Sequence, residues 1–154
     1  MKAVIQRVNY ASVEIDGDIK AFVNRGYLIL LGVGAEDEES DAQLLANKIS
    51  KLRIFCDEND KMNLSIKDIG GKALVISNFT LYANCTHGNR PDFFESAKPD
   101  LAEPLYEKFV EVLQDLGIES FTGQFGADMK VSLQNDGPVT IILDSKLLKN
   151  KIHG

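Results

Sequence analysis

The sequence predicts a single domain of the α+β class. Segments with the pattern of β-strands come in runs, whereas α/β proteins alternate strands and helices. Only two long stretches carry apolar residues at the spacing of an amphipathic helix. The 154 residues also match the usual size of one domain and contain neither an internal repeat nor a linker-like stretch.

The N-terminal segment predicts a β-hairpin followed by a buried strand. Residues 3–8 and 12–15 alternate apolar with polar, and a turn at 16–18 leads into a strand at 19–23. Residues 27–33 form an uninterrupted apolar run between two glycines. A run this short favours a strand buried on both faces over a helix.

The first helix is predicted from residue 42 onward. Apolar residues recur there at helical spacing. The acidic run 36–39 precedes them, at the N-terminal end of the predicted helix, where the helix dipole favours negative charge. Ser40 and Gln43 have the spacing of a capping box. This helix is therefore expected to begin at about Ser40.

Two further strands are predicted after this helix, at residues 54–56 and 73–81. We interpret Cys56 in the first of them as a small core residue. The second is a long apolar strand entered through the glycine pair at 70–71. The segment 77–81 then lies at the far end of that strand.

The last part of the chain predicts one more helix and three strands. The helix begins after Pro99 and ends at Gly117, which suits a left-handed C-terminal cap. The strands cover residues 118–121, 129–133 and 139–143. By composition, residues 135–138 form a turn that joins the last two strands.

Charge and cysteine usage narrow the classes of function. The net charge of -6 opposes binding of nucleic acid along a broad electropositive face, so such a partner would have to be held locally. The basic cluster at 146–153 could supply part of that contact, with a solvated, frayed tail as the alternative. The absence of a signal-peptide pattern or a membrane-spanning run, with only two cysteines, indicates a cytoplasmic protein.

Side chains that could carry chemistry gather near the end of the predicted strand 73–81. Ser77 or Cys85 with His87 would suit a hydrolase of small acyl esters, but the set is generic and lacks a nucleophile-elbow motif. The two histidines have no ligand-pair spacing, and no phosphate-binding glycine loop is present. Neither a metal nor a cofactor is expected.

The pair Gly137-Pro138 is a further feature of the sequence. A bond that precedes proline is the only peptide bond for which the cis form costs little. Composition alone favours the plainer interpretation, an ordinary proline at the entry to a strand.

Over residues 1–145 the sequence resembles the D-aminoacyl-tRNA deacylase family, with 146–154 as a basic C-terminal tail outside the resemblance. The motifs that carry it are the opening residues 1–8, Ser77-Asn78-Phe79-Thr80-Leu81, Gly88-Asn89-Arg90-Pro91, Phe125-Gly126-Ala127-Asp128-Met129 and Asn135-Asp136-Gly137-Pro138-Val139-Thr140. At Asn78 the family pattern has glutamine, whose side chain is one methylene longer.

The resemblance implies an enzyme that hydrolyses the ester bond of D-aminoacyl-tRNA. It implies two β-sheets layered with two main helices, in a symmetric homodimer with active sites at the interface. The catalytic positions would be Ser77, Phe79 and Thr80. Backbone N–H groups of Phe79 and Thr80 would stabilise the oxyanion, and the 2′-hydroxyl of the terminal adenosine would assist the attack.

The resemblance also implies a cis Gly137–Pro138 bond that enters the active site of the other subunit. Its carbonyls would hold the substrate's amino group and occupy the place that an L side chain needs, so that L-aminoacyl-tRNA is rejected while glycyl-tRNA is cleaved. Arg7 would anchor this loop, and Asn78 would contact the substrate. A non-catalytic module that binds the tRNA 3′ end is the remaining alternative.

Overall fold

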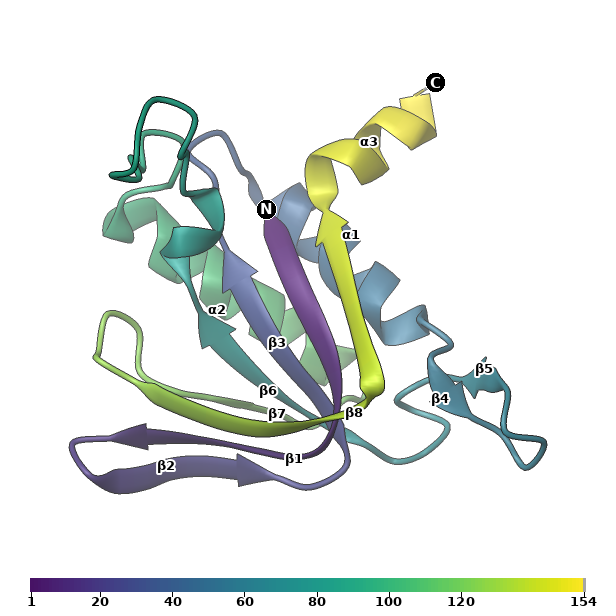
Figure 1. The fold of residues 1–154 in the computed structure, drawn as a ribbon. Coiled ribbons are helices and arrows are strands. Elements are labelled where there is room, and N and C mark those ends of the chain that lie inside the picture. The colour runs from purple at the N-terminus through teal and green to yellow at the C-terminus, as the bar shows by residue number, and fades with distance from the viewer. Residues whose placement is uncertain (154) are drawn as a thin grey trace.

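Two long antiparallel strands, β1 (Lys2–Ile15) and β8 (Lys130–Asp144), run side by side through the fold. The computed structural model describes residues 1–153 (Figure 1). β1 pairs with both halves of β8, and the register shifts between Gln6 and Tyr10. The predicted turn at 135–138 is therefore wrong. These residues form an irregularity within one strand, because β1 holds the chain on both sides of them.

The sheet has six strands in the order β2-β1-β3-β6-β7, with β8 on β1. The remaining members are β2 (Asp18–Val23), β3 (Gly26–Gly32), β6 (Lys72–Ser77) and β7 (Ser120–Thr122). β2 and β3 are antiparallel to β1, whereas β6 and β7 continue the sheet in parallel. The predicted hairpin and the buried strand after it are confirmed. A separate two-stranded sheet joins β4 (Phe55–Cys56) to β5 (Met62–Leu64).

Bending turns this one sheet into two layers. β1 and β8 curve midway, and the half of β1 that pairs with β2 turns away from β3 (Figure 1). A cluster of buried aliphatic residues, including Val13, Leu28 and Leu74, joins β1, β3 and β6 on the concave side. The expected pair of large sheets is thus replaced by one sheet folded over itself, because both longest strands are continuous.

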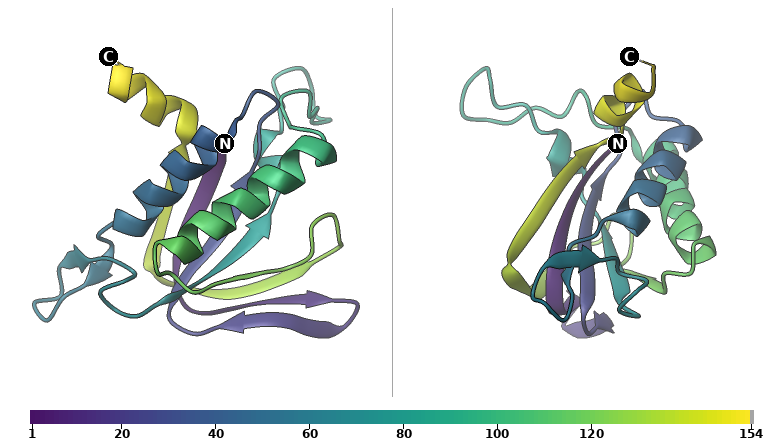
Figure 2. Two further views of the ribbon diagram at one scale, coloured as in Figure 1. Left: turned by 180° about the vertical axis from the view of Figure 1, so that it is seen from behind. Right: turned by 90° about the vertical axis from the view of Figure 1, so that its right-hand side faces the viewer.

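Two helices cover the other face of the sheet (Figure 2). They are α1 (Glu39–Lys51) and α2 (Pro99–Asp115), and the larger core lies between them and the strands. Gly117, with a φ of 89°, ends α2 as predicted. The capping box of α1 uses Glu38 and Asp41, so the prediction of Ser40 with Gln43 is wrong. Among residues 1–153, no helix is long and apolar enough to cross a membrane.

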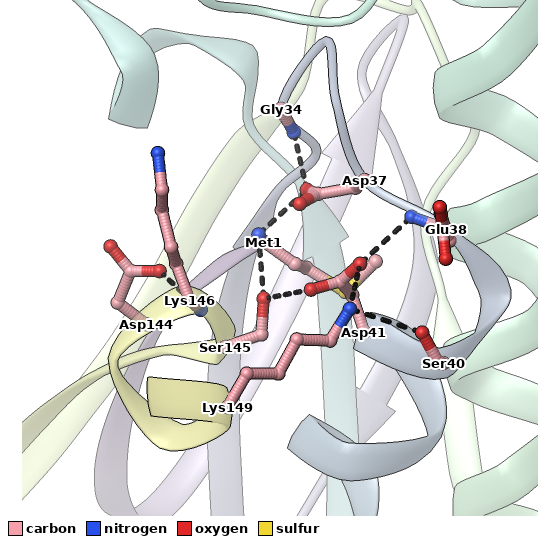
Figure 3. Close-up of polar contacts among 10 residues, drawn as sticks. All are labelled: Met1, Gly34, Asp37, Glu38, Ser40, Asp41, Asp144, Ser145, Lys146 and Lys149. Carbon is pink, nitrogen blue, oxygen red and sulfur yellow. Dashed lines mark hydrogen bonds and ion pairs between the residues drawn. The ribbon is translucent and has the colours of Figure 1, made fainter. Parts of the chain in front are cut away.

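A third helix, α3 (Ser145–His153), follows β8 and contacts α1 through a buried polar cluster (Figure 3). The Met1 ammonium group lies 2.6 Å from the Asp37 carboxylate and donates to the Ser145 hydroxyl at 2.9 Å. Ser145 donates in turn to Asp41, whose other oxygen lies 2.9 Å from the Lys149 amine. Residues 146–153 of the expected tail are thus helical, and residue 154 lies outside the described residues.

Candidate functional site

The end of β6 is where the chain changes from strand to a tight turn. Asn78 makes the last strand-like bond, from its N–H to the Leu31 carbonyl at 2.8 Å. The chain then enters the 3-10 helix η1 (Phe79–Tyr82), so the predicted strand 73–81 is shorter than expected. The first hydrogen bond of this turn is donated by Leu81 to Asn78. The N–H groups of Phe79 and Thr80 precede it and therefore have no acceptor within the turn.

A cavity of about 550 Å³ opens beside this turn. Its lining comes from the ends of β3 and β6, the start of α2 and two loops: Leu31, Val33, Ser77, Asn78, Phe79, Phe93, Ser96, Ala97, Lys98, Pro99, Ala102, Phe125, Gly126, Ala127 and Met129. Most of these side chains are apolar, and Lys98 is the one ionisable residue among them. The cavity can therefore accept an apolar or aromatic group beside a few polar atoms.

Phe79 lies at the rim of this cavity rather than in the core. Its side chain is 58% exposed, and its ring meets Phe93 edge to face at 5.0 Å between centroids. An aromatic ring that is half in water and half supported by another ring offers a surface for a planar group.

Asn78 and Thr80 are joined by a side-chain hydrogen bond. The Thr80 hydroxyl donates to the Asn78 amide oxygen at 2.5 Å. Thr80 is exposed and does not itself line the cavity, whereas Ser77, Asn78 and Phe79 do. Of the four predicted positions between 77 and 80, three therefore line the cavity, and Thr80 lies next to them in the chain but outside the lining.

The residues of the alternative hydrolase are not assembled. Cys85 and His87 are exposed in the loop that the Asn84–Asp92 bridge closes, and neither lines the cavity. Among the described residues, no hydrogen bond joins Ser77 to His87. A nucleophile and its base need such contact to act together.

Arg7 holds the Gly137–Pro138 segment to the rest of the chain. Its side chain is buried, and its guanidinium donates to the Asp136 carbonyl at 3.1 Å and to the Ile54 carbonyl at 2.7 Å. Half-buried Cys56 lies beside the same guanidinium, so Cys56 is not the core residue that we predicted. The Gly137–Pro138 bond is cis, and both residues are exposed.

Within one chain, Pro138 and the cavity are far apart. Ser77 is in register with Leu31, Leu31 with Ala3, and Ala3 with Leu143. Leu143 is therefore three strands away from Ser77 across the sheet, and Pro138 is a further five residues away along β8. At standard strand spacing, Pro138 and Ser77 are roughly 20 Å apart. The two predicted halves of the site do not meet within one chain.

Sequence reasoning missed the loop side of the cavity. Phe93, Ser96 and Lys98 line it but were not among the predicted positions. The signal that could have found them is a pair of adjacent phenylalanines in an otherwise polar loop between Pro91 and Pro99.

The family model described as D-Tyr-tRNA(Tyr) deacylase matches residues 4–144. The chain belongs to this family. A curated relative from Fusobacterium nucleatum subsp. nucleatum, named D-aminoacyl-tRNA deacylase, is 58% identical over 146 residues, which cover 95% of this chain and 97% of that protein.

Two solved structures are similar to this member of the deacylase family. One, titled "c-Myc DNA Unwinding Element Binding Protein", has a TM-score of 0.86 and 40% identity, covering 94% of this chain and 98% of that one. The other is titled as a probable eukaryotic D-amino acid tRNA deacylase, with a TM-score of 0.81, 11% identity and coverage of 92% and 97%. At that identity, the second likeness shows the shared α+β fold alone.

Proposed function

We propose that the protein hydrolyses D-aminoacyl-tRNA in the cytoplasm, releasing a free D-amino acid and tRNA. The observation that carries the proposal is the cavity at the end of β6, with the N–H groups of Phe79 and Thr80 at its mouth. Membership of the D-Tyr-tRNA(Tyr) deacylase family supports this choice of substrate.

The reaction needs few catalytic side chains. An aminoacyl ester is already activated, so hydrolysis needs a positioned water and stabilisation of the oxygen that becomes negative. In the proposal, water adds to the ester carbonyl carbon while the amides of Phe79 and Thr80 donate to its oxygen. The bond to the ribose oxygen then breaks, and that oxygen takes the proton that the attacking water gives up.

The base in this proposal belongs to the substrate. The cavity lining contains no carboxylate or histidine, and its one ionisable group is the Lys98 amine. The 2′-hydroxyl of the terminal ribose therefore assists the attacking water. The Phe79 ring supports the adenine, and Asn78, whose amide oxygen already accepts from Thr80, offers its NH₂ group to the substrate. The Ser77 hydroxyl is a further contact in the cavity.

In the proposal, a second subunit distinguishes D-aminoacyl groups from L-aminoacyl groups. Since Gly137 and Pro138 lie far from the cavity of their own chain, we place them in the cavity of the partner within a symmetric homodimer. Arg7 anchors the segment from behind. Main-chain carbonyls then occupy the position that an L side chain needs, whatever side chain the D-amino acid carries.

A deacylation assay that compares D-tyrosyl-tRNA with L-tyrosyl-tRNA tests the proposal. We expect rapid release of D-tyrosine and slow release of L-tyrosine. Equal release of both would contradict the stereochemical filter. Stable binding without release would favour the non-catalytic module, and covalent labelling of Ser77 or Cys85 by an electrophilic ester would favour the small-ester hydrolase.

A further inference from the structure

A second cavity, of about 410 Å³, lies on the other side of a thin wall from the first. The wall is a short antiparallel pairing of residues 33–35 with residues 95–97, in which Gly34 bridges Ser96. Ala35 donates to the Glu95 carbonyl and Ala97 to the Val33 carbonyl, each at 2.9 Å. Val33 and Ser96 line the first cavity, whereas their neighbours Gly34 and Glu95 line the second.

Two adjacent phenylalanines divide between these cavities. Phe93 lines the first and supports Phe79, whereas Phe94 lines the second. Phe94 is 89% exposed, more than any other large apolar side chain among the described residues. A ring so poorly covered gains contact area when a planar base stacks on it.

Charged groups in the second cavity suit a nucleotide. Neither Lys2 nor Lys146 takes part in an ion pair within residues 1–153, and the Lys146 side chain extends away from the polar cluster around Met1 (Figure 3). The Asp37 carboxylate is neutralised by the Met1 ammonium group at 2.6 Å. The Lys2 ammonium group lies over the Tyr82 ring, 4.6 Å from its centroid, and the carboxylates of Glu36 and Asp144 also line the cavity. The Asp144 carboxylate accepts from the Lys146 N–H, so the Lys146 ammonium group is the one best placed to bind a phosphate, with Lys2 beside it. The exposed carboxylate of Glu95 can accept from an exocyclic amine.

We propose that the second cavity binds the nucleotide that precedes the terminal adenosine of the substrate RNA, and that it prefers a cytidine there. This inference rests on the proposed function, which places the terminal nucleotide in the first cavity. The cytosine ring stacks on Phe94, its amine donates to Glu95, and the linking phosphate lies near Lys2 and Lys146. A free amino-acid ester of adenosine would then lack part of the binding energy.

The test uses two analogues that cannot be hydrolysed. Both carry D-tyrosine in amide linkage to 3′-amino-3′-deoxyadenosine, and one is extended by a 5′ cytidylyl group. Titration calorimetry on the wild-type protein should show about tenfold tighter binding of the extended analogue, a typical effect of one stacked base. Phe94→Ala should lose this gain and leave the affinity for the shorter analogue unchanged.

Phe22→Ala is the matched control, since Phe22 is 53% exposed on β2 and lines neither cavity. It should keep the full gain, as should Phe94→Tyr. Glu95→Ala should bind cytidylyl- and uridylyl-extended analogues equally. The inference is overturned if the wild type binds both analogues with one affinity or if Phe94→Ala keeps the gain. Tighter binding of the extended analogue without deacylation of D-tyrosyl-tRNA would instead refute the proposed function alone.

Discussion

At the scale of single residues, Thr80 is the side chain whose role can be separated from that of its backbone. Its hydroxyl hydrogen is directed to the Asn78 amide oxygen, whereas its N–H precedes the first hydrogen bond of η1. The hydroxyl therefore positions Asn78, and the amide is available to an oxyanion. Removing the hydroxyl leaves the amide in place.

Thr80→Ala should accordingly keep activity within about tenfold of wild type, because the proposed mechanism uses the main-chain amide and not the hydroxyl as donor to the oxyanion. Single-turnover deacylation of D-tyrosyl-tRNA measures this effect. Thr86→Ala, which removes a similar hydroxyl bonded to Asn84, is the control. A loss of ~10⁴-fold with the fold intact would show that the Thr80 hydroxyl acts chemically.

Removing the hydroxyl group from either of two buried tyrosines should change the stability of the protein in opposite directions. The Tyr27 hydroxyl has no hydrogen-bond partner among the described residues, whereas the Tyr106 hydroxyl donates to the Val75 carbonyl at 2.7 Å. Burial raises the pKa of both side chains, so both hydroxyls stay protonated. Tyr27→Phe should raise the free energy of unfolding by about 1 kcal/mol, and Tyr106→Phe should lower it by about 1 kcal/mol. Urea unfolding measures both, and equal losses would contradict the assignment.

At the scale of elements, Asp41 joins α1 to α3 and makes their contact sensitive to acid. Burial tends to raise the pKa of Asp41, but hydrogen bonds from the Glu38 amide, Lys149 and Ser145 outweigh it and hold the pKa below its ordinary value. A carboxylate with a lowered pKa in the folded state stabilises the protein above its unfolded pKa, about 3.9 for Asp. This contribution is lost as the pH falls through the lower, folded value.

Asp41→Asn should therefore reduce stability at pH 7 and flatten the decline of stability below about pH 4. Urea midpoints between pH 2.5 and pH 7 provide the measurement. Asp18→Asn, at an exposed position at the start of β2, is the control. An unchanged acid slope in Asp41→Asn would show that this carboxylate does not link folding to pH.

Local patterns predicted most elements, and pairing between distant residues explains the exceptions. The hairpin of β1 with β2 and the cap at Gly117 depend on neighbours in sequence, and both were predicted. The continuity of β8 depends on its pairing with β1, more than a hundred residues away. The composition of residues 135–138 does not reflect that pairing, and it therefore predicted a turn. In the site, the sequence placed the segment 77–81 at the end of a strand, although that strand ends at Ser77 and not at Leu81. Phe93 reaches the cavity only through the pairing of two loops.

At the scale of the whole molecule, the separation of Gly137 from the cavity makes dimerisation testable. A Cβ at Gly137, whose φ is 129°, would lie 3.0 Å from the Arg7 guanidinium and 2.9 Å from Val139. Gly137→Ala should displace the carbonyls and admit L-tyrosyl-tRNA. Phe79→Pro removes one amide donor at a position that tolerates proline, since Asn78 before it is extended.

A heterodimer with Gly137→Ala in one subunit and Phe79→Pro in the other distinguishes a motif that acts in the partner's site from a motif that acts in the site of its own subunit. If the motif acts across the interface, both defects fall in one site, and the other site still cleaves D-tyrosyl-tRNA and rejects L-tyrosyl-tRNA. Differently tagged subunits, purified as the mixed dimer, provide the sample for this assay. If the mixed dimer cleaves L-tyrosyl-tRNA at about half the rate of the Gly137→Ala homodimer, as one competent site in place of two requires, each motif serves its own subunit.

The pairing of β1 with β8 also sets when the chain can fold. Lys2 at the start of β1 is in register with Asp144 at the end of β8, so β1 leaves the ribosome more than a hundred residues before the strand that pairs with it. Until then β1 has one edge unpaired, and the concave cluster lacks the side chains of Val131 and Leu133. Such long-range pairing is slow and leaves strand edges open to wrong partners. The sheet therefore cannot be completed until β8 has left the ribosome, and a nascent chain stalled before residue 130 has no strand to cover the outer edge of β1.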